Sequence, residues 1–547
     1  MRPAAEPRWA HVLAVLIVAA SVGVACLWIA WPGLEYDEAR FALATFPHEG
    51  PPPTIAYTMH WKGRPVALMV VSYMGALKGW LYVPIMKAWP GSVTAVRLPV
   101  ILIGAAGLYL FYLFTRGALG WQAALVALAL AATDPIYLFT TRLDWGPVAI
   151  QHFCVLAGCF FVLRWWRRER LRDLALGFFV MGAGIFDKAT FLWLLPALAL
   201  ATVVLFPKQV WRSIHPSSVA VAAGCLLLGA APFVYYCWKW PGETFRQKFD
   251  LPGNYPEKLR TFEYILQGTP LVGWISRSAE GPPMDPPDRL ARVVYALAPR
   301  EPLAATLFLP AAVLSFLLIP AVPFNPWGRG MLFALSFCAT GFLPMMLVRN
   351  AGWVQHVSLL LPFPQLFVAA GLIGAKERVY PWVRGVVWRR VAAGVLCFVV
   401  LVLTTANLRA VAHHYFRILG YGGGVNWSEA IYCLEQSLEK RLADKILLLD
   451  WGMMPQLRLL SSGRLPADEA VLSADGSFKN VDEYISNPRV LYVKYAPGEP
   501  AMFPQTVEAF FKVSARRGYK CESLETVRDR RGRPIYEILA LHPARAK

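Results

Sequence analysis

The chain has 547 residues, of which 56% are hydrophobic and only 16% are charged, and the apolar residues stand in long runs. This composition excludes an ordinary soluble domain and indicates a membrane protein with many spans. The formal net charge of +19 does not indicate nucleic-acid binding, because the arginines stand mostly in short loops between the apolar runs, as the positive-inside rule expects.

The apolar runs predict about eleven transmembrane helices. The first run is too long for the core of a signal peptide and has no small-residue cleavage site, so we expect it to be retained. The runs lie near residues 9–31, 98–114, 121–140, 146–163, 174–186, 190–206, 217–238, 303–320, 331–348, 354–374 and 391–408.

Basic loops predict the orientation of the chain. If the N-terminus is cytoplasmic, the cytoplasmic loops include "RWWRRERLRD" and "KERVYPWVRGVVWRR", and each of the others also carries Lys or Arg. The same order places residues 32–97, 239–302 and 409–547 outside the cytoplasm. We therefore expect a membrane domain over residues 1–408 and an extracytoplasmic domain over residues 409–547.

The tail changes character. Patterns such as "KILLLD" and "RVLYVKY" predict short strands, and "WSEAIYCLEQSLEKRLADK" and "FPQTVEAFFKVSARRGY" predict helices, so we expect a small α/β domain that includes a hairpin turn at "RDRRGRP". Cys433 and Cys521 are the cysteines of this tail, and an oxidising compartment would let them pair. We predict that they form a disulfide.

A group of carboxylates follows the first run, in "GLEYDEARFALATF". Glu35, Asp37 and Glu38 have two interpretations. They form the solvated start of a surface helix, because carboxylates favour the first turn, or they serve a reaction at the membrane surface.

The next predicted outside loop reads "TTRLDWGPVAI". Asp144 precedes Pro147 by three residues, which suits a cap on the following helix. The alternative is functional: Arg142 and Asp144 face Asp37 across the same outer surface.

A third charged segment, "GAGIFDKATFLWLLP", interrupts an apolar stretch that is too short for two full spans. The turn that carries Asp187 and Lys188 should therefore lie below the outer surface. Charged residues at that depth line a polar cavity or form a structural ion pair.

Three further residues are candidates. His356 stands in "RNAGWVQHVSLLLPFPQLF", as a packing residue or a ligand, and Lys62 and Arg64 stand in "HWKGRPVALM", where a solvated loop is the ordinary explanation. Carboxylates and cations on one outer face suit a transfer whose leaving group is a phosphate. If the transferred group is a sugar, it must arrive on a lipid phosphate, because nucleotide-activated donors are not supplied outside the cytoplasm.

Segments along residues 9–375 then support a resemblance. "YDEARFA", "GALKGWLYVPIMKAW" with "VRLPVILIG", "TTRLDWGPVA", "GIFDKATFLW" and "HVSLLLPFPQLF" occur in an order and spacing that resemble GT-C fold glycosyltransferases. These belong to the protein mannosyltransferase-like superfamily, which includes bacterial aminoarabinose and lipopolysaccharide-core transferases and uses polyprenyl-phosphate-linked sugars.

The resemblance implies site residues. The catalytic aspartate of such families corresponds to Asp37 with Glu38 as its motif partner, a second acid corresponds to Asp144, and a lysine that contacts phosphate corresponds to Lys188. The chain departs from the aminoarabinose transferases at "KGRPV", where those enzymes have Lys-Pro-Pro. That departure weakens the roles of Lys62 and Arg64.

We therefore expect a multi-pass glycosyltransferase of the bacterial inner membrane. It moves a sugar from a polyprenyl-phosphate donor to an extracytoplasmic glycan, lipid or protein acceptor, with inversion at the anomeric carbon and no nucleic-acid partner. The resemblance implies no required cofactor and leaves a divalent metal open, without assigned ligands. The expected catalytic residues are Asp37, Glu38 and Asp144, and the expected phosphate-site residues are Lys188, Arg142, Arg64, Lys62, His356 and Asp187.

Two rival functions remain open at this point. One is a transporter or flippase for a lipid-linked sugar, and the other is a non-catalytic assembly protein of the cell envelope.

Overall fold

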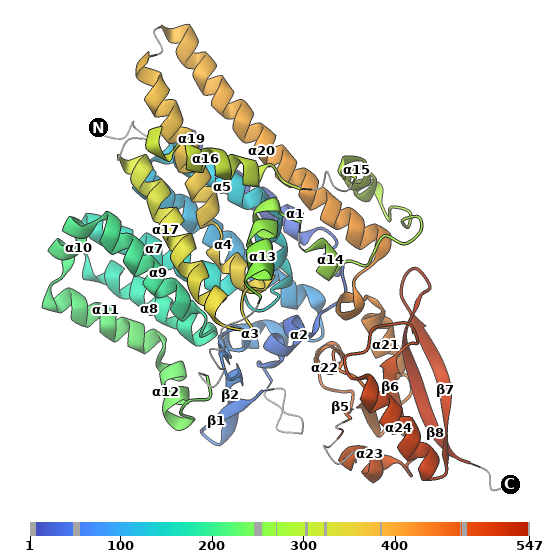
Figure 1. Cartoon of the computed structure of the whole chain (residues 1–547). Coiled ribbons are helices and arrows are strands. Elements are labelled where there is room, and N and C mark those ends of the chain that lie inside the picture. Colours follow the sequence, from blue (N-terminus) through green and yellow to red (C-terminus); the bar gives the residue numbers. More distant parts are fainter. Residues whose placement is uncertain are drawn as a thin grey trace.

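The computed structural model describes residues 7–46, 55–244, 254–269, 271–300, 305–321, 325–382, 385–470, 472 and 478–544. Residues 47–54 and 245–253, which belong to the two predicted loops, lie outside the described residues. A helical bundle carries a small strand-containing domain at one end (Figure 1).

Helices occupy most of the described part of each of the eleven predicted apolar runs. The bundle helices are α1 (Arg8–Cys26), α4 (Val93–Leu119), α5 (Trp121–Thr133), α6 (Pro135–Leu143), α7 (Ala149–Arg168), α8 (Leu171–Asp187), α9 (Phe191–Leu205), α10 (Pro207–Ser213), α11 (Pro216–Gly229), α12 (Ala231–Lys239), α16 (Phe308–Leu317), α17 (Pro326–Leu347), α18 (Val354–Val357), α19 (Phe363–Val379) and α20 (Val386–Tyr421). Within the described residues, six helices are long and apolar enough to cross a membrane, or nine if each bent pair is one span. This confirms the predicted mainly helical membrane architecture.

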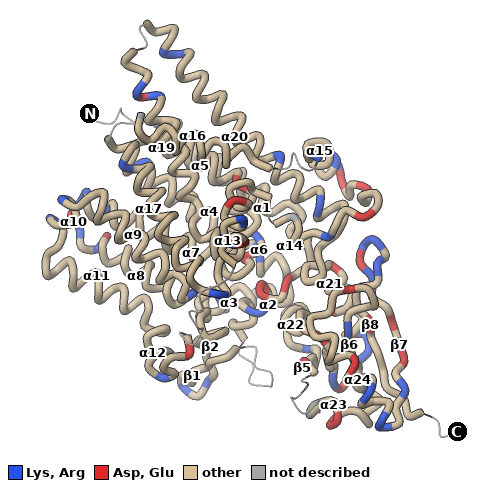
Figure 2. The backbone as a smooth tube through the Cα atoms, in the orientation of Figure 1, with Lys and Arg blue, Asp and Glu red and all other residues tan. Residues whose placement is uncertain are grey.

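The helices pack side by side through apolar faces. α7 contacts α4 and α8, α8 contacts α11, and α17 contacts α9 and α19. Figure 2 shows few charged residues along the middle of these helices and many at their ends and in the tail. The predicted basic loops lie at the ends of α4, α7, α9 and α19 that face away from α2 (Tyr36–Leu43), so basic loops and the carboxylates of α2 occupy opposite ends of the bundle.

The segment between α1 and α4 lies at the end of the bundle where α4 begins. It holds α2, the strands β1 (Tyr57–Trp61), β2 (Arg64–Val71) and β3 (Met74–Gly75) in one antiparallel sheet, and then α3 (Leu77–Ala88). Later in the chain, α13 (Tyr255–Gln267), α14 (Val272–Ile275) and α15 (Arg289–Leu297) precede α16.

The tail forms the expected α/β domain. Its sheet has the order β5-β4-β6-β8-β7, in which β4 pairs in parallel with β5 and β6 and β8 runs antiparallel to β6 and β7. The strands are β4 (Lys445–Leu448), β5 (Ala467–Glu469), β6 (Val490–Tyr495), β7 (Tyr519–Arg528) and β8 (Pro534–Pro543). α20 continues to Tyr421, beyond the expected boundary at residue 408, so this domain follows the end of that helix.

Both faces of the tail sheet are covered because its side chains alternate. Ile446 and Leu448 pack with α21 (Ala430–Glu439) and α22 (Met454–Leu460). Leu447 packs on the other face with α23 (Lys479–Tyr484) and α24 (Pro504–Arg516).

The predicted disulfide is wrong. Cys433 lies on α21 and Cys521 on β7, and both thiols are free. Cys521 packs into the apolar cluster of α23 and α24, which is the face of the sheet away from α21. The sheet therefore separates Cys521 from α21, which carries Cys433.

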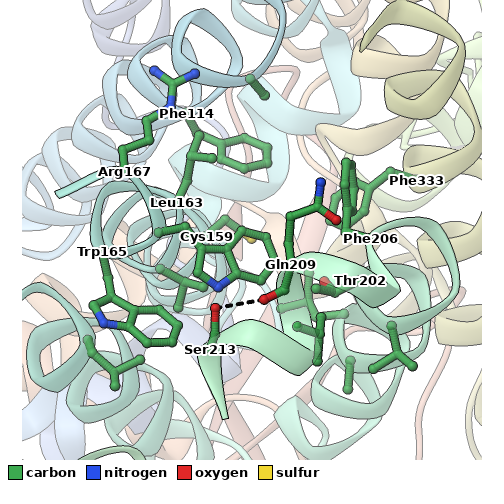
Figure 3. A pocket seen from close by; sticks show the side chains of 18 of the residues that line it. Phe114, Cys159, Leu163, Trp165, Arg167, Thr202, Phe206, Gln209, Ser213 and Phe333 are labelled. Carbon is green, nitrogen blue, oxygen red and sulfur yellow. Dashed lines mark hydrogen bonds between the residues drawn. The ribbon is translucent and has the colours of Figure 1, made fainter. Parts of the chain in front are cut away.

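An apolar cavity of about 910 Å³ lies in the bundle among α4, α7 to α11 and α17. Figure 3 shows that Phe114, Leu163 and Phe333 contribute to its wall and that Gln209 and Ser213 lie beside it. Phe114 is near the end of α4 that is remote from α2. The cavity is therefore at the opposite end of the bundle from the carboxylates, and its mainly hydrocarbon wall suits an apolar chain better than a reaction.

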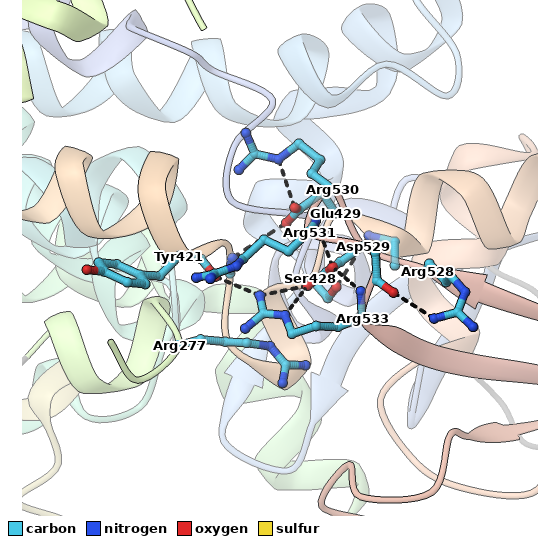
Figure 4. Close-up of polar contacts among 12 residues, drawn as sticks. Arg277, Tyr421, Ser428, Glu429, Arg528, Asp529, Arg530, Arg531 and Arg533 are labelled. Atoms are coloured by element: carbon cyan, nitrogen blue, oxygen red, sulfur yellow. Dashed lines mark hydrogen bonds and ion pairs between the residues drawn. The ribbon is translucent and has the colours of Figure 1, made fainter. Parts of the chain in front are cut away.

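Arginines of the β7–β8 turn hold the tail against the membrane part (Figure 4). Arg530 lies 3.8 Å above the Trp31 ring, and its Nε donates to Glu429 at 2.8 Å. Arg533 donates to the carbonyl of Tyr421 at 2.6 Å. The "RDRRGRP" segment is thus the predicted hairpin turn, and it also joins the two parts of the chain.

Candidate active site

Glu35 begins α2. Its Oε2 accepts from the backbone N–H of Asp37 at 2.6 Å and of Glu38 at 3.4 Å, and Glu38 accepts from the N–H of Glu35 at 3.1 Å. This reciprocal arrangement is a capping box. Glu35 therefore begins a helix as one interpretation expects, but it is 4% exposed and not solvated.

Glu38 is fixed by Arg97 of α4. The Arg97 guanidinium donates to both carboxylate oxygens of Glu38, at 2.8 and 2.7 Å, and to the carbonyls of Ile29, Pro32 and Gly33. Glu38 is 1% exposed and Arg97 is fully buried. With Glu35 and Glu38 bound in this way, Asp37 is the half-buried carboxylate of α2, and it senses the charges of Lys78 on α3 and of Lys188.

Asp144 performs two tasks at once. It lies at the end of α6 with φ 46°, in the left-handed region, which Asp adopts more readily than most residues. Its Oδ1 accepts from the N–H groups of Val148 and Ala149, so it caps α7 as the sequence suggested. Its Oδ2 lies 2.8 Å from Lys78 Nζ, and both side chains are buried.

Lys188 follows α8 and is fully buried. Its backbone is held to the β3 region by a bridge to Met74 and by a hydrogen bond from Ala189 N–H to the Tyr73 carbonyl at 2.9 Å. Its Nζ donates to the carbonyl of Gly146 at 2.6 Å. The turn thus places the ammonium next to the loop that carries Asp144.

Asp187 points to a different partner. Its Oδ2 accepts from Gln151 Nε2 of α7 at 2.8 Å. The two charged residues of this turn therefore have separate hydrogen-bond partners, which connect α8 to two parts of the α6–α7 region.

Asp37, Lys78, Asp144 and Lys188 form what we call the charged cluster. Burial raises the pKa of the Asp37 carboxyl above its ordinary value, and the positive charges of Arg40, Lys188 and Lys78 oppose that rise. A carboxylate whose pKa is raised accepts a proton more readily near neutral pH. Two buried ammonium groups beside it supply positive charge for a departing anion.

Other predicted site residues lie elsewhere. Arg142 is buried, and its guanidinium donates to the hydroxyl of Tyr415 at 2.6 Å and to the carbonyls of Trp28 and Trp31. It joins the end of α1 to α20. Lys62 and Arg64 are exposed at the tip of the β1–β2 hairpin, and the structure does not bring them to the charged cluster.

His356 is buried in α18, with its ring centroid 6.1 Å from that of Trp193. Among the described residues its Nδ1 has no hydrogen-bond partner. The preceding residue, Gln355, lies against Gly146, so His356 stands at the edge of the charged cluster.

Lys78 is the member of the cluster that the sequence interpretation missed. It stands in "GALKGWLY", where a lysine at the start of a short helix gives no sign of burial. A signal was available in principle, because the segment lies between apolar residues and belongs to the quoted resemblance. Its pairing with Asp144 brings the start of α3 to the loop between α6 and α7, a contact that is not readable from spacing.

No group of three or more His, Cys, Asp and Glu side chains suited to a metal ion occurs in the described part of the chain. Asp37 and Asp144 are the carboxylates of the charged cluster, and two lysines accompany them. Metal ligands therefore stay unassigned.

Comparisons with known proteins agree with the expected fold. A family model described as dolichyl-phosphate-mannose-protein mannosyltransferase matches residues 77–236, which include Lys78, Asp144 and Lys188. No curated protein sequence matches the chain.

Two solved structures cover nearly the whole chain. ArnT from Cupriavidus metallidurans in the apo state is 15% identical, with 96% of this chain and 97% of ArnT covered and a TM-score of 0.57. The same ArnT bound to undecaprenyl phosphate is 16% identical over the same shares, with a TM-score of 0.54. These matches confirm the predicted fold class, including the strand-containing tail.

Proposed function

We infer that the chain is an integral membrane glycosyltransferase of the GT-C, protein mannosyltransferase-like superfamily, which uses a lipid-linked sugar donor. The matched family model and the shared fold support this. The observation that carries the inference to a site is the charged cluster, in which a half-buried carboxylate of α2 lies within electrostatic reach of two buried lysines and a second carboxylate.

Asp37 is the carboxylate that acts on the acceptor. A hydroxyl of the acceptor attacks the anomeric carbon of the donor sugar, and its proton passes to Asp37 as the new C–O bond forms. The bond from the anomeric carbon to the phosphate oxygen breaks, and the electron pair leaves with the lipid phosphate. A single displacement of this kind inverts the anomeric configuration.

Lys188 and Lys78 stabilise the leaving phosphate. Each is buried, so its charge acts through little intervening water. Lys188 Nζ donates to the Gly146 carbonyl, and Lys78 pairs with Asp144. Asp144 holds Lys78 in place, and His356 borders the site. The elements around the site are positioned by Asp187, Arg142 and Glu38.

The cluster and the tail lie on the extracytoplasmic side of a bacterial inner membrane. The basic loops at the opposite end of the bundle support this orientation. The donor is a polyprenyl-phosphate sugar, and the acceptor is a glycan, lipid or protein of the cell envelope. The reaction uses charges that the chain itself supplies, so we propose no required cofactor and leave a divalent metal unassigned.

The test is consumption of a donor by purified protein. The full chain in lipid nanodiscs is mixed with radiolabelled undecaprenyl-phosphate sugars and with envelope extracts as acceptors, and we expect label to leave the lipid for an acceptor. A transporter would instead move intact lipid across proteoliposomes without loss of sugar. That result, with no transfer in nanodiscs, would overturn the proposed function.

A further inference from the structure

Four tryptophans from distant parts of the sequence meet beside the charged cluster. The ring centroids of Trp145 and Trp274 lie 5.7 Å apart, and those of Trp274 and Trp353 lie 5.8 Å apart in an edge-to-face arrangement. Trp427 lies 6.3 Å from Trp145 and is also edge-to-face. Such contacts fix the relative orientation of the rings.

The group of four tryptophans is held by backbone hydrogen bonds as well as by ring contacts. The N–H of Gly424 donates to the carbonyl of Ile275 at 2.9 Å, and the N–H of Arg277 donates to that of Gly422 at 3.2 Å. These bonds attach α14, with Trp274, to the segment that precedes Trp427. Trp427 is 4% exposed and is the buried member of the group.

Two of the rings remain open to a ligand. Trp274 is 47% exposed and Trp353 is 44% exposed, although both are already ordered by their contacts with each other and with Trp145. An aromatic surface that is ordered before binding loses little conformational entropy when a ligand packs on it.

The tryptophans adjoin the charged cluster directly. Trp145 stands between Asp144, which pairs with Lys78, and Gly146, whose carbonyl accepts from Lys188 at 2.6 Å. A Cβ at Gly146 would lie 2.7 Å from Gln355 Cγ and 3.6 Å from Lys188 Nζ. The loop therefore brings the lysine, the glutamine and the rings into one place.

Polar atoms without partners accompany the rings. Gln355 Oε1 and His356 Nδ1 are buried, and neither has a hydrogen-bond partner among the described residues. Buried polar groups in proteins are usually paired, so each such atom calls for an explanation. A ligand with several hydroxyl groups would satisfy both.

We propose that Trp145, Trp274 and Trp353 form the platform on which the sugar ring of the lipid-phosphate donor packs, with Gln355 and His356 as hydrogen-bond partners of its hydroxyls. This inference rests on the proposed function and names the sugar subsite of the same site. The flat apolar face of a pyranose packs on an indole ring, and pockets for such ligands combine aromatic walls with a few placed polar groups. Lys188, whose Nζ donates to the carbonyl of Gly146 next to Trp145, takes the phosphate.

Tryptophans also anchor proteins at a membrane surface, where they act one by one as amphipathic rings. The present rings differ, because they contact each other across four chain segments and border buried polar atoms. Membrane anchoring is therefore an outcome of the test and not the proposal.

The experiment measures binding of two kinds of lipid to the full chain in nanodiscs by native mass spectrometry. One probe is undecaprenyl phosphate, and the others are undecaprenyl-phosphate-linked mannose, glucose and aminoarabinose. Trp274→Ala and Trp353→Ala are compared with Trp274→Phe, which keeps an aromatic ring. Trp238→Ala is the control, because Trp238 is 78% exposed on α12 and outside the cluster.

We expect wild-type protein to prefer one glycosylated lipid over undecaprenyl phosphate. In the alanine variants the ratio of the affinities for the glycosylated lipid and for undecaprenyl phosphate should fall about tenfold. Their affinity for undecaprenyl phosphate itself should stay within about twofold of wild type. Trp274→Phe and Trp238→Ala should keep most of the wild-type preference.

Two outcomes would overturn the platform. In the first, wild type shows the preference and the alanine variants retain it, so the rings do not recognise sugar. In the second, the alanine variants lose affinity for both kinds of lipid equally, which indicates membrane anchoring. If wild type binds none of the lipids, the proposed function fails and the platform fails with it.

Discussion

Lys78 Nζ and Asp144 Oδ2 are 2.8 Å apart, and both side chains are buried. This ion pair joins the start of α3 to the loop between α6 and α7. Removing one partner of a buried pair leaves an uncompensated charge, whereas removing both partners avoids that cost.

Lys78→Met should therefore lower both stability and transfer, and the double variant Lys78→Met with Asp144→Asn should recover stability alone. Thermal unfolding in detergent and transfer rate at saturating acceptor measure the two effects separately. A double variant that transfers sugar at the wild-type rate would show that the pair is only structural.

Arg97 should be essential for stability. Its guanidinium compensates Glu38 and binds three carbonyls of the segment after α1, so Arg97→Met leaves a buried carboxylate unpaired. We expect a loss of about 3–5 kcal/mol in the free energy of unfolding. Arg489→Met is the matched control, because Arg489 forms a surface ion pair with Asp444, and it should cost far less. Equal stability of the two variants would refute the structural role of Arg97.

The pH dependence of transfer should reflect Asp37. Burial raises its pKa and the positive charge of Arg40 opposes that rise, so activity should fall as the pH falls through the raised value, because the protonated form cannot accept a proton. Arg40→Met removes the opposing charge, so the pKa rises further and the acid limb of the rate profile should move to higher pH. An unchanged limb, or a shift to lower pH, would separate Asp37 from the observed titration.

Arg530 should fix the tail to the membrane part through Trp31 and Glu429. Arg530→Met should increase hydrogen exchange at the start of the tail, since the contacts with Trp31 and Glu429 are lost while Arg533 still donates to the Tyr421 carbonyl. Arg528 is the control, because it donates to Gly532 inside the same hairpin, and Arg528→Met should leave exchange at the junction unchanged. Identical exchange patterns for the two variants would contradict this role.

The sequence predicted the helices, the tail and three members of the charged cluster because these depend on local signals. Apolar runs identify spans, and a charge at membrane depth is costly enough to indicate a special role, which singles out Lys188. Asp144 is recognisable from its outside loop, three residues before Pro147. The partners depend on packing between distant segments. Arg97, Lys78 and the contact of Lys188 with Gly146 therefore required the structure.

Packing between distant segments also explains where the structure differs from the predictions. Cys433 and Cys521 share a domain and a compartment in the prediction, but the sheet that separates them is a property of the fold. Arg142 was expected to face Asp37, yet a buried arginine with five donors binds the nearest carbonyls, which here are those of Trp28 and Trp31. The sequence leaves the roles of Glu35 and Glu38 undivided, whereas the structure makes Glu35 the cap of α2 and pairs Glu38 with Arg97.

The central claim is that Asp37 takes the proton of the acceptor. Asp37→Asn keeps the shape of the side chain and removes its charge, so single-turnover transfer from a bound donor should fall by about 10²–10⁴ while donor binding and thermal unfolding stay close to wild type. Glu469→Gln is the control, because Glu469 of β5 also senses the charge of Arg40 but stands outside the charged cluster, and it should transfer nearly normally. Transfer by Asp37→Asn at close to the wild-type rate would contradict the account.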